Sequence, residues 1–425
     1  MTVLLIVSTL LILVLMGLPI ALALGATGLF AVMSAGLPLQ AVPQLIYNSA
    51  NSYALTAIPL FMLMGAIVER AGMGKHMIDF ASTLVGWMRG GLAHVNTVVS
   101  FLFAGMNGSS GADVASMGPI LIPEMKRKGY PVNFAAAITS STSDAAILIP
   151  PSITLIVYGV LANVSITRMF LAGIIPGVVL MAAYMALSHY FAVKYKWPVH
   201  ETFDIKKVGP ATRKAGPALL IPLIIMGGIL GGIFTATEAA SVAVFTAAII
   251  VLVFYRNMSL RDTYEILIVT AKRTGMVMMI VAASGILAWY LSNRQIPQQM
   301  AMSLLEFTDN YYAITLIVCA FLIMLGTMIN GVPAMIILVP VLLPIMTAIE
   351  MDPIHFGIIF ALATTVGSQT PPVASTMLLT CSIAGISIGE MWKMNRWFIF
   401  VNIIVMLVVA VLPVFSLWLP SLILD

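Results

Sequence analysis

Two polar clusters of the sequence carry side chains that suit the binding of small ions. The first comprises GMNGSSGAD at 105–113 and SSTSD at 140–144, and the second an Asn-Gly pair at 330–331 and GSQT at 367–370. Hydroxyl and amide oxygens, with carbonyls freed where a helix breaks, coordinate a cation such as sodium, whereas the N-terminus of a half-helix favours an anionic group. Ser and Thr in membrane helices can also bond back to their own backbone. Both interpretations stay open.

Asp113 and Asp144 add carboxyl groups to the first cluster. A charge at membrane depth costs roughly 2.5–3.5 kcal/mol on insertion scales, so such residues normally have a partner or a role. Asp113 follows Asn107 by six residues and either caps the next helix or adds negative charge to a cation site. The second cluster has no matching carboxylate at its tip, so the two clusters are expected to differ in charge.

The composition places these clusters inside a membrane. Hydrophobic residues make up 61% of the 425 residues and charged residues 8%, with a mean hydropathy of +1.07. Roughly a quarter of the residues of a soluble domain are charged, so we expect an all-α polytopic membrane protein. A spanning helix needs about 20 apolar residues. Nine segments qualify or nearly do: 2–34, 53–69, 131–162, 168–192, 216–234, 238–255, 275–292, 353–384 and 395–419.

Two further apolar stretches, 93–123 and 311–349, are interrupted midway by Asn107-Gly108 and Asn330-Gly331. We expect two re-entrant helical hairpins. Backbone that leaves a helix at membrane depth must be buried in protein or face a water-filled cavity, because lipid cannot satisfy its hydrogen bonds. The polar clusters are therefore expected at the hairpin tips and at breaks in the spans that follow them.

The basic residues predict the orientation. If the turn Lys126-Arg127-Lys128 is cytoplasmic, threading the nine spans places all of the 20 basic residues except Arg168 and Arg294 inside, as the positive-inside rule requires. The N-terminus is then cytoplasmic and the C-terminus lies on the opposite side. The first hairpin enters from the cytoplasm and the second from outside.

Repeated landmarks relate the two hairpins. Asn-Gly occurs only at 107 and 330 and Pro-Pro only at 150 and 371, with spacings of 43 and 41 residues. Because the copies enter from opposite sides, they form an inverted repeat, which is typical of secondary transporters whose substrate and ions bind where broken helices meet. The span 216–234 serves as the odd linker between the halves.

Amphipathic stretches at 73–88, 259–273 and 296–308 are expected to lie in the interface plane, either as connecting loops or as arms that brace a mobile core. Five regions are predicted: 1–92, scaffold helices and an interfacial arm; 93–163, hairpin 1 and its broken helix; 164–310, scaffold, linker span and arms; 311–385, hairpin 2 and its broken helix; 386–425, a C-terminal scaffold helix.

The sequence gives little support to a transition-metal site, a nucleic-acid-binding surface or a nucleotide site. The two cysteines, Cys319 and Cys381, lie in apolar runs, and the five histidines have no ligand spacing, so we expect no transition metal. The basic residues lie in short turns rather than in a nucleic-acid-binding patch. There is no Walker motif, so transport is expected to draw on ion gradients.

The sequence resembles the large membrane subunit of tripartite ATP-independent periplasmic (TRAP) transporters of the sialic-acid and dicarboxylate kind. The similarity covers essentially the whole chain. It is carried by the motifs GMNGSSGAD at 105–113, IPPS at 149–152, GIFTATEAA at 232–240, NGVPA at 330–334 and QTPP at 369–372.

The resemblance implies a sodium-driven elevator transporter of the bacterial inner membrane, with no cofactor other than its coupling ions. The organic acid, sialic acid in the first instance, is expected to arrive on a soluble periplasmic binding protein, and a small four-helix membrane subunit is expected as a partner. By position, the implied sodium ligands are Asn107, Gly108, Ser109, Asp113, Ser143, Asp144, Asn330, Gly331, Gly367 and Thr370. The implied substrate ligands are Ser109, Ser110, Ser152 and Asn330.

Three alternatives remain. A C4-dicarboxylate permease of the same family and a stand-alone sodium and anion symporter share the architecture. An intramembrane serine protease of the rhomboid type is a remote third, because Gly108-Ser-Ser110-Gly111 fits its GxSG pattern. Such an enzyme needs a histidine base on a neighbouring helix, and neither His94 nor His355 is expected at the required depth.

Overall fold

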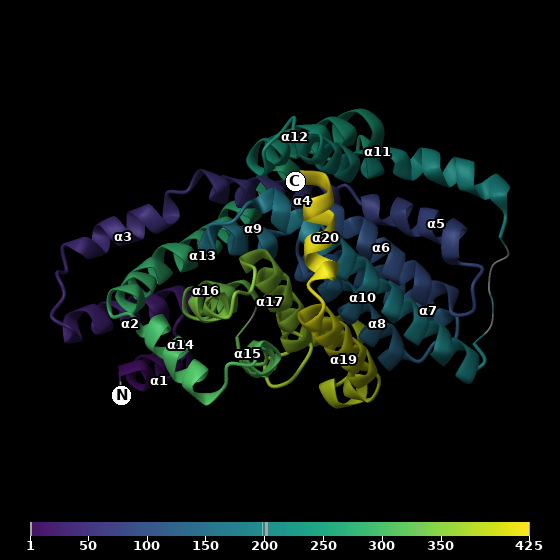
Figure 1. Ribbon diagram of the computed structural model, residues 1–425. Helices are drawn as coiled ribbons and strands as arrows, with labels where there is room; N and C mark the ends of the chain where they lie inside the picture. The colour runs from purple at the N-terminus through teal and green to yellow at the C-terminus, as the bar shows by residue number, and fades with distance from the viewer. Residues whose placement is uncertain (1, 198, 200–202, 330, 425) are drawn as a thin grey trace.

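The protein is all-helical in the computed structural model, which describes residues 2–197, 199, 203–329 and 331–424 (Figure 1). No strand occurs among these residues. The helices of the first part are α1 Thr2–Leu15, α2 Ile20–Ser34, α3 Ala41–Ala50, α4 Ala57–Arg70, α5 Met73–Val85, α6 Gly91–Asn107, α7 Ser110–Arg127, α8 Val132–Ala145, α9 Ile153–Leu161 and α10 Ile166–Lys194. Short 3-10 turns, Tyr53–Thr56 and Ala146–Leu148, precede α4 and follow α8.

The second part of the chain continues the same pattern. Its helices are α11 Ile205–Leu230, α12 Ala236–Ile250, α13 Leu260–Asn293, α14 Ile296–Phe307, α15 Tyr311–Gly326, α16 Gly331–Ala348, α17 Pro353–Gly367, α18 Ser375–Ala384, α19 Ile388–Val411 and α20 Val414–Leu424. A π-helical segment, Val251–Tyr255, extends α12. Figure 1 shows α11 and α12 together along one edge, and α1, α2 and α14 at one end of the molecule.

Both predicted hairpins are present. Helices α6 and α7 pack against each other across the turn at Asn107-Gly108, and α15 and α16 do so across the second turn. Each hairpin contacts the broken helix that follows it in the chain: α6 and α7 contact α8, and α15 and α16 contact α17. The predicted pairing of one hairpin with one broken helix in each half is therefore confirmed.

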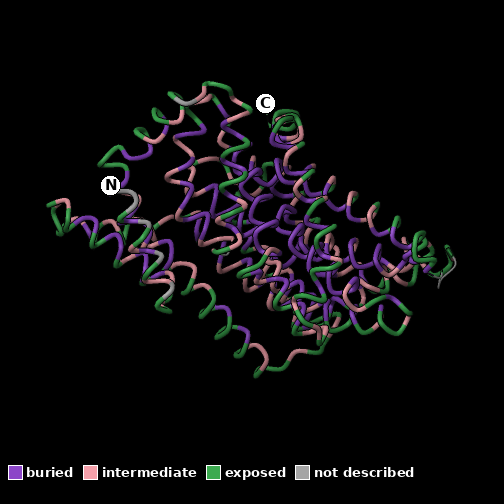
Figure 2. The backbone as a smooth tube through the Cα atoms, turned by 90° about the horizontal axis from the view of Figure 1, so that it is seen from below, coloured by how far each residue is buried: buried purple, intermediate pink, exposed green. Residues whose placement is uncertain are grey.

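The broken helices form the centre of the molecule. Every residue of 134–145 in α8 and of 354–367 in α17 is buried. The axes on either side of the first break, Val132–Leu148 and Ile153–Leu161, differ in direction by 41°. Figure 2 shows the buried residues gathered inside the bundle and the exposed ones on outer turns and outward faces. Because residues 134–145 of α8 are enclosed, the serines and threonines among them must find partners within the protein.

The structure has fewer continuous spans than the nine predicted segments, two of which, 131–162 and 353–384, were expected to be broken. Seven of the described helices are long and apolar enough to cross a membrane, or eight if the bent pair α8–α9 counts as one span. The predicted span 2–34 is wrong as a single helix, because it divides into α1 and α2. Gly17 adopts a left-handed conformation with φ +84°, which ends a helix. Pro19, which has no amide hydrogen, directly precedes α2.

Two other boundaries differ from expectation. The stretch 259–273 was expected as a separate interfacial helix, but it is continuous with the span 275–292 as the 34-residue helix α13. Gly275 does not break it, because a glycine inside a helix costs only about 1 kcal/mol and keeps its amide hydrogen. The predicted span 395–419 is divided at Pro413, between α19 and α20.

Candidate functional site

A cavity of about 340 Å3 lies where both hairpins and both broken helices meet. Residues from both halves of the chain form its wall, and α4 and α13 complete it. The lining residues are Met62, Gly108, Ser109, Ser110, Gly111, Asp144, Ile147, Ile153, Thr154, Val277, Gly331, Val332, Pro333, Thr364, Ser368, Ser375, Thr376 and Leu379.

Four helices begin at this cavity: α7, α9, α16 and α18 each contribute residues of their first turn to its lining. The first amides of a helix have no partner within it, and they carry a positive partial charge. Among the lining residues that the structure describes there is no lysine or arginine. The helix N-termini are therefore the positive groups that this wall offers to an anion.

Asp144 joins the two halves at the cavity wall. It lies near the end of α8 and is 1% exposed. Its Oδ2 accepts a hydrogen bond from Ser368 Oγ at 2.7 Å, and its Oδ1 accepts one from Thr376 Oγ1 at 2.8 Å. Both donors come from the second half of the chain. Because hydrogen bonds to a charged group contribute about 1.5–3 kcal/mol each, Asp144 holds the two broken helices in register.

Asp113 lies behind the cavity, in the first turn of α7, and is fully buried. Its Oδ2 accepts a hydrogen bond from Ser143 Oγ at 2.6 Å. Its Oδ1 has no hydrogen-bond partner among the described residues. A buried acceptor without a partner carries a desolvation penalty of about 1–3 kcal/mol, so this oxygen can receive a cation or a donor.

The first hairpin tip is shaped by its Asn-Gly turn. Asn107 Oδ1 accepts a hydrogen bond from the Ser109 amide at 3.3 Å, while its Nδ2 has no partner in the described part of the chain. Gly108 has φ +57°, and a Cβ there would lie 2.8 Å from the Pro151 carbonyl oxygen. The turn therefore requires glycine. Gly108, Ser109 and Ser110 all line the cavity.

Six of the predicted ligands that the structure describes lie outside the cavity lining: Asn107, Asp113 and Ser143, described above, and Ser152, Gly367 and Thr370. Ser152 caps α9, its Oγ accepting a hydrogen bond from an amide of the first turn at 3.3 Å. Thr370 donates its hydroxyl to the Val366 carbonyl at 2.8 Å. Gly367 packs against Gly326, and a Cβ at Gly367 would lie 2.4 Å from the Gly326 carbonyl carbon. In this structure, these residues shape the helices around the cavity.

The second hairpin tip is partly described. Gly331 begins α16 and lines the cavity, whereas Asn330 lies outside the described residues. The cavity also contains Thr364, Ser375 and Thr376, which the sequence analysis did not select. Ser375 and Thr376 are recognisable in the sequence as a Ser-Thr pair at the start of the apolar run after the second Pro-Pro. The first Pro-Pro is also followed by hydroxyl residues, Ser152 and Thr154, so both repeats have Ser or Thr at the helix start after Pro-Pro.

A second polar contact ties the halves together behind Asp144. Ser141 Oγ donates a hydrogen bond to Gln369 Oε1 at 2.7 Å, and Asn395 Nδ2 donates one to the Gln369 carbonyl oxygen at 3.3 Å. All three side chains are buried. The break after α17 is therefore held by α8 on one side and by α19 on the other.

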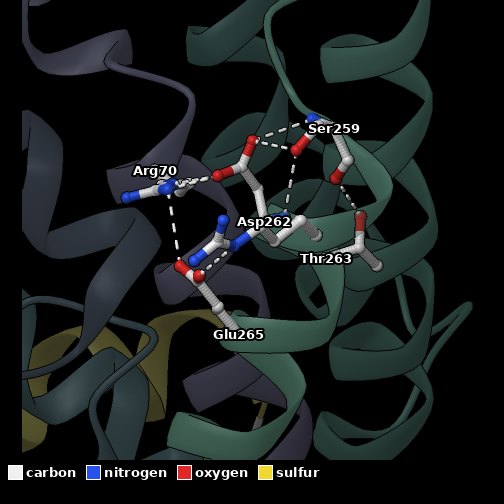
Figure 3. A network of polar contacts seen from close by, with 6 residues as sticks. Arg70, Ser259, Asp262, Thr263 and Glu265 are labelled. Carbon is white, nitrogen blue, oxygen red and sulfur yellow. Dashed lines mark hydrogen bonds and ion pairs between the residues drawn. The ribbon is translucent and has the colours of Figure 1, made fainter.

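The remaining wall of the cavity is apolar. Met62 of α4 and Val277 of α13 line it, and Thr274 Oγ1 contacts Met62 Sδ at 3.7 Å. At one end of these two helices, Arg70 forms ion pairs with Asp262 and Glu265 (Figure 3). These ion pairs link α4 to α13, the two helices that carry the apolar side chains.

The family model described as "Tripartite ATP-independent periplasmic transporter, DctM component" matches residues 7–415. Curated relatives agree. The chain is 35% identical to the C4-dicarboxylate TRAP transporter large permease protein DctM of Pseudomonas aeruginosa, over 88% of each chain. It is 32% identical to the sialic acid TRAP transporter large permease protein SiaM of Vibrio cholerae, over 96% of each. These relatives are transporter permeases rather than enzymes.

The fold is also similar to that of a solved transporter. The crystal structure of the Alcanivorax borkumensis YdaH transporter, described as having an unusual topology, superposes with a TM-score of 0.67. The similarity covers 89% of this chain and 88% of that one, at 12% sequence identity. At this identity the likeness concerns the fold alone, and it supports the expected polytopic helical architecture.

Proposed function

This chain belongs to the DctM component family of tripartite ATP-independent periplasmic transporters, and we propose from this premise that it couples the uptake of an organic acid to sodium. The cavity between the hairpins is the proposed substrate site. The two broken helices and their carboxyl groups are the proposed sodium sites. Transport proceeds by an elevator movement of the hairpin-bearing core against the scaffold that includes α4 and α13.

The observation that carries the proposal is the convergence of four helix N-termini on one cavity. An organic anion placed there receives hydrogen bonds from backbone amides without needing a basic side chain. Ser109 and Ser110 lie in the same lining, and their hydroxyls suit the substrate's hydroxyl groups. Broken helices at the meeting point of two repeats are where secondary transporters bind their cargo.

The two buried carboxyl groups support sodium as the coupling ion. Asp144 lies on the cavity wall, and Asp113, which accepts a hydrogen bond from the adjacent Ser143, has one oxygen without a partner among the described residues. A sodium ion beside either group offsets the negative charge, which is costly to bury. Because each carboxyl group contacts a hydroxyl at 2.6–2.8 Å, it lies among oxygens that a hard cation accepts as ligands.

The wall favours a monocarboxylate with a hydroxylated body, such as sialic acid, over a dicarboxylate. Asp144 adds negative character, and the described lining has no basic side chain to balance a second substrate charge. The seven Ser and Thr residues of the lining suit hydroxyl groups. The sialic acid relative from Vibrio cholerae covers nearly the whole chain. A C4-dicarboxylate is the second candidate, because the DctM relative shares comparable identity.

The family description names a tripartite periplasmic system, and the proposed assembly follows it. A soluble periplasmic binding protein delivers the acid, and a small four-helix membrane subunit completes the transporter in the bacterial inner membrane. The N-terminus is cytoplasmic and the C-terminus periplasmic. This orientation rests on the basic residues of the connecting turns.

Reconstitution in proteoliposomes tests this function. The chain, with its small subunit, is supplied with binding proteins loaded with sialic acid or with a C4-dicarboxylate, in sodium or in potassium buffer. We expect uptake of sialic acid only in sodium and only with its binding protein. Uptake that is equal in potassium would exclude sodium coupling. Uptake without any soluble protein would identify a stand-alone symporter, and uptake of the dicarboxylate alone would reassign the substrate.

A further inference from the structure

A second cavity, of about 470 Å3, lies away from the transport site. It is a groove between α5 and the hairpin helices α6 and α7. The groove runs alongside two polar turns, one where α5 ends at Val85 and one where α7 ends at Arg127. In a membrane protein, such turns mark the boundary between hydrocarbon and water.

Charged side chains of both signs line this groove. Lys75 and Asp79 come from α5, and Glu124, Arg127 and Lys128 come from the end of α7. Arg127 forms an ion pair with Glu124. The side chains of Lys75 and Asp79 are both exposed, and neither makes a hydrogen bond or ion pair with another described residue. The groove therefore offers a cation and an anion side by side, a pattern that suits a zwitterion better than a simple anion.

Apolar side chains form the rest of the groove. Ile78 on α5 and Leu92, Ile120 and Leu121 on the hairpin line it, and Ile120 is 41% exposed. The neighbouring Trp87 is 46% exposed, and exposed tryptophan is enriched where a membrane meets water. The groove thus combines apolar and charged side chains, which matches the two parts of a phospholipid.

We propose that this groove binds a phospholipid with a primary-ammonium headgroup, such as phosphatidylethanolamine. The phosphate faces Lys75, and the ammonium group faces Asp79, one turn along α5. The acyl chains follow the apolar side chains of the groove. A headgroup without an N–H donor, or without a positive charge, leaves the acidic side of the groove unsatisfied. The occupant therefore differs from the bulk lipid by headgroup chemistry.

A lipid bound in this groove would affect how α5 packs on hairpin 1. α5 packs closely on α7, because a Cβ at Gly74 would lie 2.2 Å from Met117 Cε. The lipid lies beside this contact and touches both helices. It thus fills the space between α5 and the base of hairpin 1. Removing the lipid weakens the packing of that hairpin against α5.

Lipid-dependent thermal unfolding of the purified chain in neutral detergent tests the proposal. Phosphatidylethanolamine, phosphatidylcholine and phosphatidylglycerol with identical acyl chains are added at matched concentrations. We expect phosphatidylethanolamine to give the largest rise in Tm and the highest apparent affinity. Equal responses to the three lipids would overturn headgroup selectivity, and a larger response to phosphatidylglycerol would show a site for anions only.

Two variants locate the site. Asp79→Asn is expected to reduce the preference for phosphatidylethanolamine over phosphatidylcholine, and Lys75→Gln is expected to weaken binding of both lipids. Exposed charge pairs support losses of roughly two- to fivefold in affinity. Asp309→Asn and Lys272→Gln remove exposed charges away from the groove and should behave as wild type. Lipid retention measured by native mass spectrometry gives a second readout, and unchanged retention in both groove variants refutes the assignment.

Discussion

At the scale of residues, the chemistry is concentrated in two carboxyl groups with different surroundings. Asp144 has both oxygens occupied by hydroxyl donors from the other half of the chain. Asp113 has one oxygen occupied from its own half and one without a partner among the described residues. The first group is therefore suited to sensing whether the halves are aligned, and the second to accepting an additional ligand.

Asp144→Asn is expected to weaken sodium-dependent uptake. The amide removes the negative charge and provides only one acceptor oxygen, so one hydroxyl loses its partner. A loss of about 1.5–3 kcal/mol in the free energy of sodium binding corresponds to roughly a 10- to 150-fold increase in the sodium concentration for half-maximal uptake. Asp309→Asn, in an exposed loop, is the matched control. A sodium dependence identical to wild type in Asp144→Asn would remove this carboxyl group from the coupling site.

Thr376→Val tests the contact from the other half. The substitution keeps the volume but removes the hydroxyl that donates to Asp144 at 2.8 Å. We expect apparent sodium affinity to fall by roughly tenfold, because a hydrogen bond to a charged group is lost. Thr380→Val is the control on the same helix, since Thr380 Oγ1 only bonds back to the Thr376 carbonyl. Uptake assays in which both variants behave alike would contradict a specific role for Thr376.

At the scale of elements, close helix crossings hold the hairpins against the broken helices. α15 and α17 approach so closely that Gly367 has no room for a side chain, and a Cβ at Gly326 would lie 3.2 Å from Gly367 Cα. The first hairpin tip also has a close backbone contact, between Gly108 and the Pro151 carbonyl. Backbone contact of this kind is typical of membrane helices, where small residues let helices pack without a hydrophobic driving force.

Gly367→Ala is expected to separate α15 from α17. Overpacking of a close contact costs about 1–3 kcal/mol, so the protein should unfold at a lower temperature and transport more slowly. Gly227→Ala in α11 is the control, because a Cβ there would meet nothing within 4 Å. Thermal unfolding in detergent gives the measurement. A melting temperature unchanged in Gly367→Ala, relative to wild type and Gly227→Ala, would show that the crossing relaxes at no cost.

At the scale of the whole molecule, two similar units enclose one cavity, yet they supply it with different charges. The first unit brings Asp113 and Asp144, while the described part of the second brings hydroxyls and helix N-termini. Under the proposed function, each half supplies one sodium site, and two sodium ions carried with one monoanion give the cargo a net charge of +1. The proposed stoichiometry is thus two sodium ions for each acid.

Uptake is therefore expected to respond to membrane potential. With two sodium ions and one monoanion, one positive charge enters per cycle, and it gains about 2.3 kcal/mol at 100 mV, inside negative. Proteoliposomes with a potassium gradient and valinomycin provide this potential. Initial rates should rise when the inside is negative and fall when the sign is reversed. Rates that are independent of the potential would rule out this stoichiometry.

Much of this architecture is determined locally, and the sequence by itself therefore predicted it. Apolar length defines most spans, Asn-Gly marks the first turn because Gly108 needs a left-handed conformation, and the spacing of Asn-Gly and Pro-Pro pairs reveals the repeat. The polar clusters were visible because polar residues are rare in so apolar a chain. These signals depend on neighbouring residues, which the sequence displays directly.

Only the tertiary structure decided which polar residues meet. Asp144 and Thr376 are 232 residues apart in the chain, and no local pattern relates them. Ser152 and Thr370 were predicted as ligands by their position in motifs, but one caps a helix and the other bonds to its own turn. Whether a hydroxyl faces the cavity or its own backbone depends on helix rotation and on the bend at each break. Packing between distant helices sets both, so the cavity and its four helix N-termini emerge only when the two halves are assembled.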